Sequence, residues 1–184
     1  MLREVETEYK YLISNELFKE LLSKCSKKYD FLEHKLQVNY YYDTAENLLN
    51  RSKTTVRIRQ NLNKMKLQIK KHRIENDTLS VSDEYSSSVN ELPSVLKIPD
   101  VQDPVTLKGV LITERNIYTF GENSSICFDT NIYLGVCDYE IEIEVDKTDK
   151  NKALSVIDFL GLVQMPIMSK SERFFERFEM MNGK

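Results

Sequence analysis

Two segments of the chain carry acidic residues at every second position, a spacing that suits metal binding by an extended strand. The first holds Glu4, Glu6, Glu8 and then Lys10, and the second holds Asp138, Glu140, Glu142 and Glu144. Side chains two positions apart point to the same face of a strand, so the carboxylates of each segment lie side by side. Carboxylate oxygens are the ligands that Mg²⁺ and Mn²⁺ prefer in proteins.

Two other segments carry basic residues with the same spacing. Their same-face residues are Arg57 and Arg59 in one segment, and Lys64, Lys66, Gln68 and Lys70 in the next. Guanidinium and ammonium groups bind phosphate oxygens through charge-assisted hydrogen bonds. Any one such strand is also typical of the solvent-facing side of a sheet. Surface charges usually mix signs because like neighbours repel, so strands of one sign each favour polar faces that surround a highly charged ligand.

The elements that must position these residues are mainly strands. Alternation and β-branched or aromatic content predict eight, at 3–13, 36–43, 54–60, 64–72, 78–85, 110–120, 126–133 and 137–145. Apolar periodicity predicts helices over 15–28, over 149–160 and after Ser169 or Ser171. A short helix is expected near 89–97, within an excursion over 86–108 that contains three prolines.

We therefore predict a single α+β, mainly β domain over residues 1–184. Its architecture is a closed eight-stranded antiparallel β-barrel with a charged interior, and the three longer helices pack on its apolar outer face. Phe174, Phe175 and Phe178 are expected to belong to the core rather than to a ligand site, and Tyr40, Tyr41 and Tyr42 to pack in the barrel wall.

Composition narrows the classes of function. The chain has 26 basic and 29 acidic residues and a net charge of −3, which argues against binding to nucleic acid or to a membrane through bulk charge. Its five glycines form no phosphate-binding loop, so any phosphate must be bound by side chains. Three cysteines without CxxC spacing, and no apolar run long enough to span a membrane, predict a cytoplasmic protein. We expect a monomer or a homodimer.

The acidic segment near the N-terminus opens a series of motifs. The series reads Glu6-Thr-Glu8-Tyr-Lys10, Tyr42-Asp43-Thr44, Val56-Arg57-Ile-Arg59, Leu67-Gln-Ile-Lys70, Thr113-Glu-Arg115, Phe128-Asp129-Thr130, Asp138-Tyr-Glu140-Ile-Glu142-Ile-Glu144 and Met168-Ser169-Lys170-Ser171. In its order across residues 4–173 it resembles the CYTH proteins, or triphosphate tunnel metalloenzymes. Among these the chain is most similar to the small single-domain bacterial members.

The resemblance implies a tunnel in which basic residues hold a linear triphosphate and acidic residues hold one or two Mg²⁺ or Mn²⁺ ions. The implied metal ligands are Glu6, Glu8, Glu140 and Glu142, with Glu84 and Glu144 as further candidates. The implied phosphate contacts are Lys10, Arg57, Arg59, Lys70, Arg115 and Lys170. Alternation adds Lys66, which shares a face with Lys70. Catalysis is expected to depend most on Glu6, Glu8, Lys10 and Glu142.

The predicted activity is metal-dependent hydrolysis of inorganic triphosphate or of a nucleoside triphosphate. The alternatives are an adenylate cyclase of the same family, a thiamine triphosphatase, and a polyphosphate-binding regulatory module without turnover. Two local expectations accompany this prediction. His72 is expected to be exposed at the end of its strand, and neighbouring carboxylates such as Glu6 and Glu8 are expected to raise one another's pKa, against the opposing effect of Lys10 and Arg59.

Overall fold

The computed structural model describes residues 1–74, 79–146, 148–163, 165 and 168–183. The first residue of the predicted strand 78–85 therefore lies outside the described residues.

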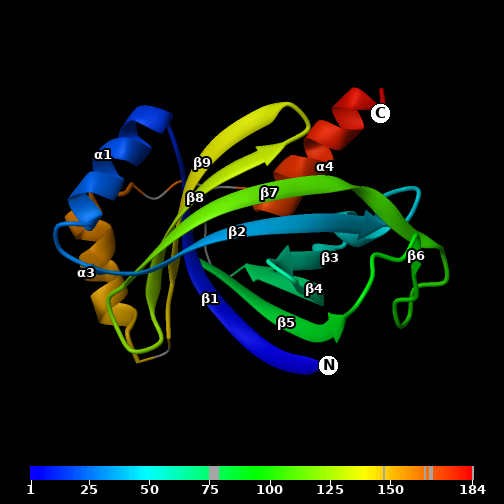
Figure 1. Ribbon diagram of the computed structural model, residues 1–184, viewed down its shortest axis with the longest axis horizontal. Coiled ribbons are helices and arrows are strands. Elements are labelled where there is room, and N and C mark those ends of the chain that lie inside the picture. Colours follow the sequence, from blue (N-terminus) through cyan, green and yellow to red (C-terminus); the bar gives the residue numbers. More distant parts are fainter. Residues whose placement is uncertain (75–78, 147, 164, 166–167, 184) are drawn as a thin grey trace.

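Within the described residues the chain forms nine strands and four helices (Figure 1). The strands are β1 (Leu2–Ile13), β2 (Asp30–Asp43), β3 (Thr54–Asn61), β4 (Lys64–Ile74), β5 (Leu79–Val89), β6 (Val95–Leu96), β7 (Val105–Thr119), β8 (Ser125–Tyr133) and β9 (Val136–Glu144). The helices are α1 (Asn15–Cys25), α2 (Leu48–Arg51), α3 (Lys150–Leu160) and α4 (Lys170–Met181). Of the helices described, none has the length and apolar character needed to cross a membrane.

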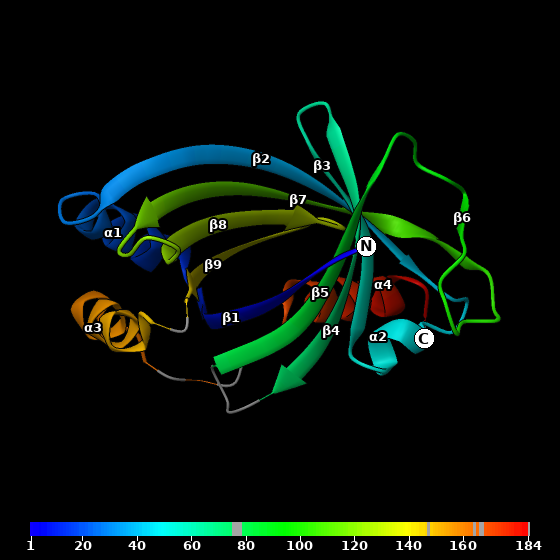
Figure 2. The same ribbon diagram turned by 90° about the horizontal axis from the view of Figure 1, so that it is seen from below.

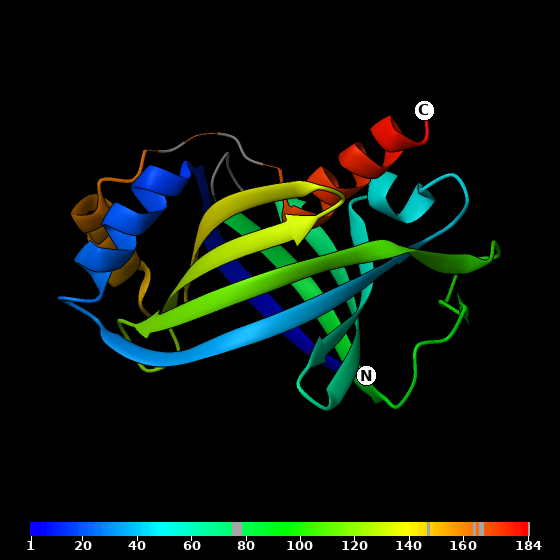
Figure 3. The same cartoon turned by 45° about the horizontal axis from the view of Figure 1, so that its top comes forward.

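Eight of the strands form a closed antiparallel barrel, which confirms the predicted fold. Neighbouring strands follow the order β2-β3-β4-β5-β1-β9-β8-β7, and β2 also pairs with β7, which closes the ring. The remaining strand, β6, pairs with the first two residues of β7. Figures 2 and 3 show the curved strands wrapping around a common interior, with α1 and α3 outside the ring.

Helices α1 and α3 cover the outer face of β8 and β9, side by side at one end of the molecule (Figure 1). Phe18 of α1 packs edge-on against Phe128 of β8, with ring centroids 5.6 Å apart. Val156 and Leu160 of α3 belong to the same buried cluster, and both are at least nine-tenths buried. Burying this apolar surface fixes the outward face of these strands, so their alternate residues must point into the barrel.

The excursion between β5 and β7 covers a second part of the outer face. The helix expected near 89–97 is absent: Val89 is the last residue of β5, and Val95 and Leu96 form β6. Pro93 lies between them, and a helix through it would lose a backbone hydrogen bond. Leu96 instead packs in a cluster with residues of β2, β3 and β4, namely Tyr42, Val56, Ile58 and Ile69.

The one-turn helix α2 was not predicted, and a buried carboxylate stabilises its start. Asp43 is fully buried and accepts hydrogen bonds from the backbone N–H groups of Thr44, Leu49 and Asn50 at 2.7, 3.0 and 2.9 Å. The bonds from Leu49 and Asn50 satisfy donors of the first turn that the helix itself leaves without partners.

Helix α4 packs at one end of the barrel. Its Phe174 and Phe175 form a cluster with Tyr41, Leu111 and Tyr133, and these three strand residues point inward. The ring of Phe174 lies 4.8 Å from that of Tyr41. Figure 3 shows α4 at the end of the barrel beside the turn between β8 and β9. Helix α4 therefore closes one end of the interior.

Candidate active site

The inward-facing side chains surround a cavity of about 60 Å³. Ten of the residues predicted for the site line it: Glu6, Glu8, Lys10, Arg57, Arg59, Lys70, Arg115, Glu142, Glu144 and Lys170. Three others, Lys66, Glu84 and Glu140, do not. Because the cavity is small and charged groups contact each other across it, a charged ligand would have to replace some of these contacts.

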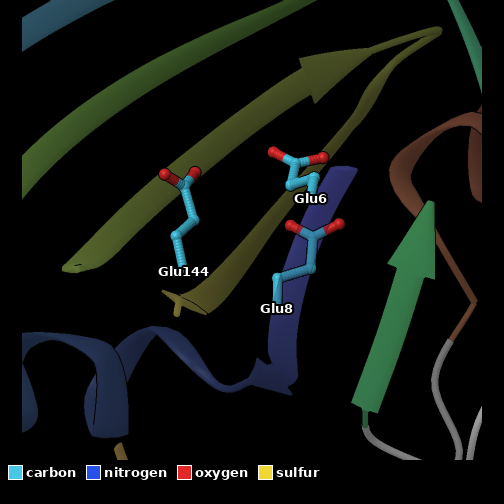
Figure 4. A group of neighbouring side chains, drawn as sticks. All are labelled: Glu6, Glu8 and Glu144. Atoms are coloured by element: carbon cyan, nitrogen blue, oxygen red, sulfur yellow. The ribbon is translucent and has the colours of Figure 1, made fainter. Parts of the chain in front are cut away.

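Three carboxylates in the cavity are close enough to share one cation. Oxygens of Glu6, Glu8 and Glu144 all lie within 4.8 Å of one another. Figure 4 shows Glu6 and Glu8 on β1 and Glu144 on the neighbouring strand β9, and Glu8 is paired with Glu144 in the strand register. This all-oxygen donor set fits Mg²⁺ or Mn²⁺.

The same carboxylates already hold a positive charge from the protein. The ammonium group of Lys70 contacts Glu6 and donates to Glu8 at 2.7 Å, and that of Lys10 lies 2.9 Å from Glu8. Burial favours a higher pKa for Glu6, but Lys70 outweighs this effect and the pKa of Glu6 is lowered. The pKa of Glu144 is raised by burial against the opposing charge of Arg115. At Glu6 the opposing positive charge therefore outweighs the effect of the neighbouring carboxylates, whereas the pKa of Glu144, which was not among the acids expected to show a rise, is raised.

Arg115 is held in place by carboxylates from two neighbouring strands. It donates two hydrogen bonds to Asp129 of β8 at 2.7 and 2.6 Å, and a third to Glu144 of β9 at 2.7 Å. A further hydrogen bond reaches Glu142. The parallel pair with Asp129 fixes the plane of the guanidinium group.

Lys170, the first residue of α4, enters the cavity among three of these acids. Its ammonium group lies 2.7 Å from Glu142, 2.8 Å from Asp129 and 3.1 Å from Glu140. Burial favours a higher pKa for Glu142, but Lys170 and Arg115 hold it well below the ordinary value. Glu142 therefore stays ionised and orients two cations in the structure.

Glu140 lies behind Lys170 rather than at the cavity surface. It is fully buried and accepts a hydrogen bond from Arg173 at 2.6 Å, and Arg173 also binds Asp138 at 3.0 Å. The predicted ligand Glu84 lies to the side, 3.8 Å from Arg57, and Gln68 joins both residues by hydrogen bonds. Lys66 is exposed beyond the cavity, near the turn between β3 and β4.

Sequence reasoning missed the roles of Asp129 and Arg173, which hold the predicted residues. The signals were present. Asp129 alternates with buried Asn131 along β8, and Arg173 follows Lys170 by three positions on one helix face. Neither signal distinguishes a residue that contacts substrate from one that positions its neighbour.

A chain of neutral groups forms another wall of the cavity. The Oγ1 atom of Thr55 lies 3.1 Å from Nε2 of His72 and 2.7 Å from Oγ of Ser171, which lies 3.1 Å from Oγ of Ser169. His72 is therefore not the exposed residue that was expected. Burial and the charges of Lys70 and Lys10 lower its pKa to about 3, so the ring is neutral.

Comparison with known proteins places this barrel among characterised folds. Residues 4–175 match the CYTH domain family. No curated protein sequence matches the chain. A Bacillus halodurans protein described as a candidate adenylate cyclase has a similar structure, with a TM-score of 0.74, 26% identity, and coverage of 95% of this chain and all of that one.

Two more distant structures share the fold. One is a Hippeastrum protein described as a candidate adenylyl cyclase with a dominant triphosphatase activity; it has a TM-score of 0.74 and 22% identity, and the match covers 93% of this chain and 95% of that one. The other is the RNA triphosphatase domain of a mimivirus capping enzyme, with a TM-score of 0.57, 13% identity, and coverage of 85% and 88%.

Proposed function

Because the chain belongs to the CYTH domain family, we propose that it is a metal-dependent hydrolase that cleaves a linear triphosphate inside its barrel. The substrate is inorganic triphosphate or a nucleoside triphosphate. One observation carries the proposal: a single cavity is lined both by three clustered carboxylates and by six Lys and Arg side chains. A polyphosphate with its counter-ions is the ligand that needs both kinds of group within a few ångströms.

The carboxylates of Glu6, Glu8 and Glu144 are the residues that would hold Mg²⁺ or Mn²⁺. When bound, such an ion neutralises phosphate charge and lowers the pKa of a coordinated water. The contact of Lys70 with Glu6 and Glu8 supports this role, because these carboxylates already bind one cationic group. Once another cation neutralises them, the Lys70 ammonium group is free to donate to phosphate oxygens.

The remaining basic residues bind and orient the phosphates. Lys10, Arg115 and Lys170 reach the cavity from three different elements and are each positioned by a buried carboxylate. Groups fixed in this way stabilise the charge that develops on the leaving diphosphate without having to reorganise. Hydrolysis needs only a water as nucleophile, so no side chain has to form a covalent intermediate.

The second candidate is an adenylate cyclase, which the description of the Bacillus halodurans relative favours. The two candidates differ in product. We would incubate the purified protein with inorganic triphosphate, ATP or thiamine triphosphate, in Mg²⁺ or Mn²⁺, and identify the products by chromatography. Release of orthophosphate supports the hydrolase, whereas cyclic AMP and diphosphate from ATP support the cyclase. Binding of all three compounds without turnover would contradict both and favour a regulatory module.

A further inference from the structure

The turn between β3 and β4 borders a second, solvent-open cavity that is larger than the first. Its volume is about 580 Å³, and it is lined by Arg59, Lys64, Lys66 and Gln68 together with the turn residues 61–63. Arg59 lines both cavities, so its side chain borders the two spaces.

Arg59, Lys64 and Lys66 differ from most other basic residues of the first cavity because they have no carboxylate partner among the residues that the structure describes. Lys10, Lys70, Arg115 and Lys170 each form ion pairs. Among the described residues, no carboxylate lies within ion-pair distance of Arg59, Lys64 or Lys66.

The register brings two of these cations together. Arg59 pairs directly with Lys66 across β3 and β4, and Lys64 follows on the same face of β4. Like charges at directly opposite positions destabilise a pair of strands. Arg59 donates its Nε–H to Asn39 at 2.8 Å, an arrangement that leaves its terminal nitrogens available. Burial and the charges of Arg57 and Arg115 lower the pKa of Arg59 to about 10, so the side chain stays protonated at neutral pH.

We propose that Arg59, Lys64 and Lys66 form a subsite for a phosphoryl group beyond the three held in the barrel. The substrate class is then linear inorganic polyphosphate of four or more phosphoryl groups, a refinement that rests on the proposed function. An anion at this position relieves the repulsion between Arg59 and Lys66 without breaking any ion pair. A nucleoside fits less well, because the lining contains no aromatic ring on which a base could stack.

Calorimetric binding tests the subsite without depending on turnover. Inorganic triphosphate, inorganic tetraphosphate and ATP would be titrated into metal-free protein. We expect tetraphosphate to bind about fivefold more tightly than triphosphate, the effect of one added contact with an exposed charge. Lys66→Gln should remove most of this ratio, leaving the statistical advantage of the longer chain. The control Lys71→Gln, which removes an exposed charge from the outer face of the same strand, should retain the ratio.

Several results would overturn the proposal: equal affinity of the wild type for the two inorganic anions, an unchanged ratio in Lys66→Gln, tighter binding of ATP than of tetraphosphate, or no binding at all.

The repulsion between the two cations gives a check without ligand, because free Lys66→Gln should melt no lower than wild type. A parallel hydrolysis assay separates this proposal from the previous one. Turnover of triphosphate without the affinity ratio refutes only the subsite, and the ratio without turnover refutes only the hydrolase.

Discussion

Asp129 is a buried carboxylate that contacts both Arg115 and Lys170, and Asp129→Asn is the sharpest test of how the site is built. The residue is fully buried, accepts two hydrogen bonds from Arg115, and lies 2.8 Å from Lys170. Removing one partner of a buried ion pair costs about 3–5 kcal/mol, because the other charge stays buried. Asparagine keeps one acceptor oxygen, so we expect a loss of about 3 kcal/mol. For a chain of this size, that loss lowers the melting temperature by about 6–12 °C.

Thermal and urea unfolding of wild type and Asp129→Asn measure this loss. Asp158→Asn is the matched control, since it removes the same charge from an exposed position on α3. The variant leaves Arg115 and Lys170 with less negative charge, so triphosphate should raise its melting temperature by more than it raises that of wild type. The reasoning is refuted if Asp129→Asn melts as the control does, or if triphosphate stabilises it less than wild type.

Three further predictions follow from packing, charge and titration. A Cβ atom at Gly109 would lie 2.9 Å from the Phe174 ring, so Gly109→Ala should melt several degrees lower than wild type. Adding Phe174→Leu should recover part of this loss, and equal melting of Gly109→Ala and wild type would contradict the prediction. Triphosphate at 100 times its dissociation constant should stabilise wild type by about 2.7 kcal/mol and Lys70→Ala by much less, measured as a shift in melting temperature. An undiminished shift in Lys70→Ala would place Lys70 outside the binding site. The pKa of His72 is lowered to about 3, below the value of about 6.5 in the unfolded chain, so the unfolded state binds its proton first as the pH falls. Stability should therefore drop by about 1–2 kcal/mol between about pH 6.5 and about pH 5, and His72→Gln should show a smaller drop in urea melts; an identical pH dependence would refute the assignment.

Side chains of opposite character alternate along the strands, and this alternation allowed the barrel and much of its lining to be predicted. Lys10, Arg57, Lys70 and Glu142 all face the interior because alternation along a strand encodes which face a residue occupies. The same rule applied to His72, which is two positions from Lys70 and also faces the cavity. The predicted exposure of His72 rested on its position near the end of a strand and did not use this rule.

Alternation does not encode depth along the barrel axis. Glu140 and Glu144 share a face of β9, yet the register pairs Glu144 with Glu8 at the carboxylate cluster and Glu140 with Leu12. Which acids meet therefore depends on pairing between strands distant in sequence. Similarly, the apolar stripe of α4 shows that Phe174 is buried but does not show that it packs against the inward face of the strands.

Phosphorus NMR of inorganic triphosphate incubated with the protein tests the central claim most directly. In Mg²⁺ or Mn²⁺, the triphosphate resonances should give way to those of diphosphate and orthophosphate, and a chelator should stop the conversion. Glu6→Gln removes one oxygen charge from the carboxylate cluster, so its rate should be lower by orders of magnitude, while Glu91→Gln, at an exposed position outside the cavity, should keep the wild-type rate. Hydrolysis that continues in chelator, or that survives Glu6→Gln undiminished, would contradict the assignment of this cavity as a metal-dependent triphosphatase site.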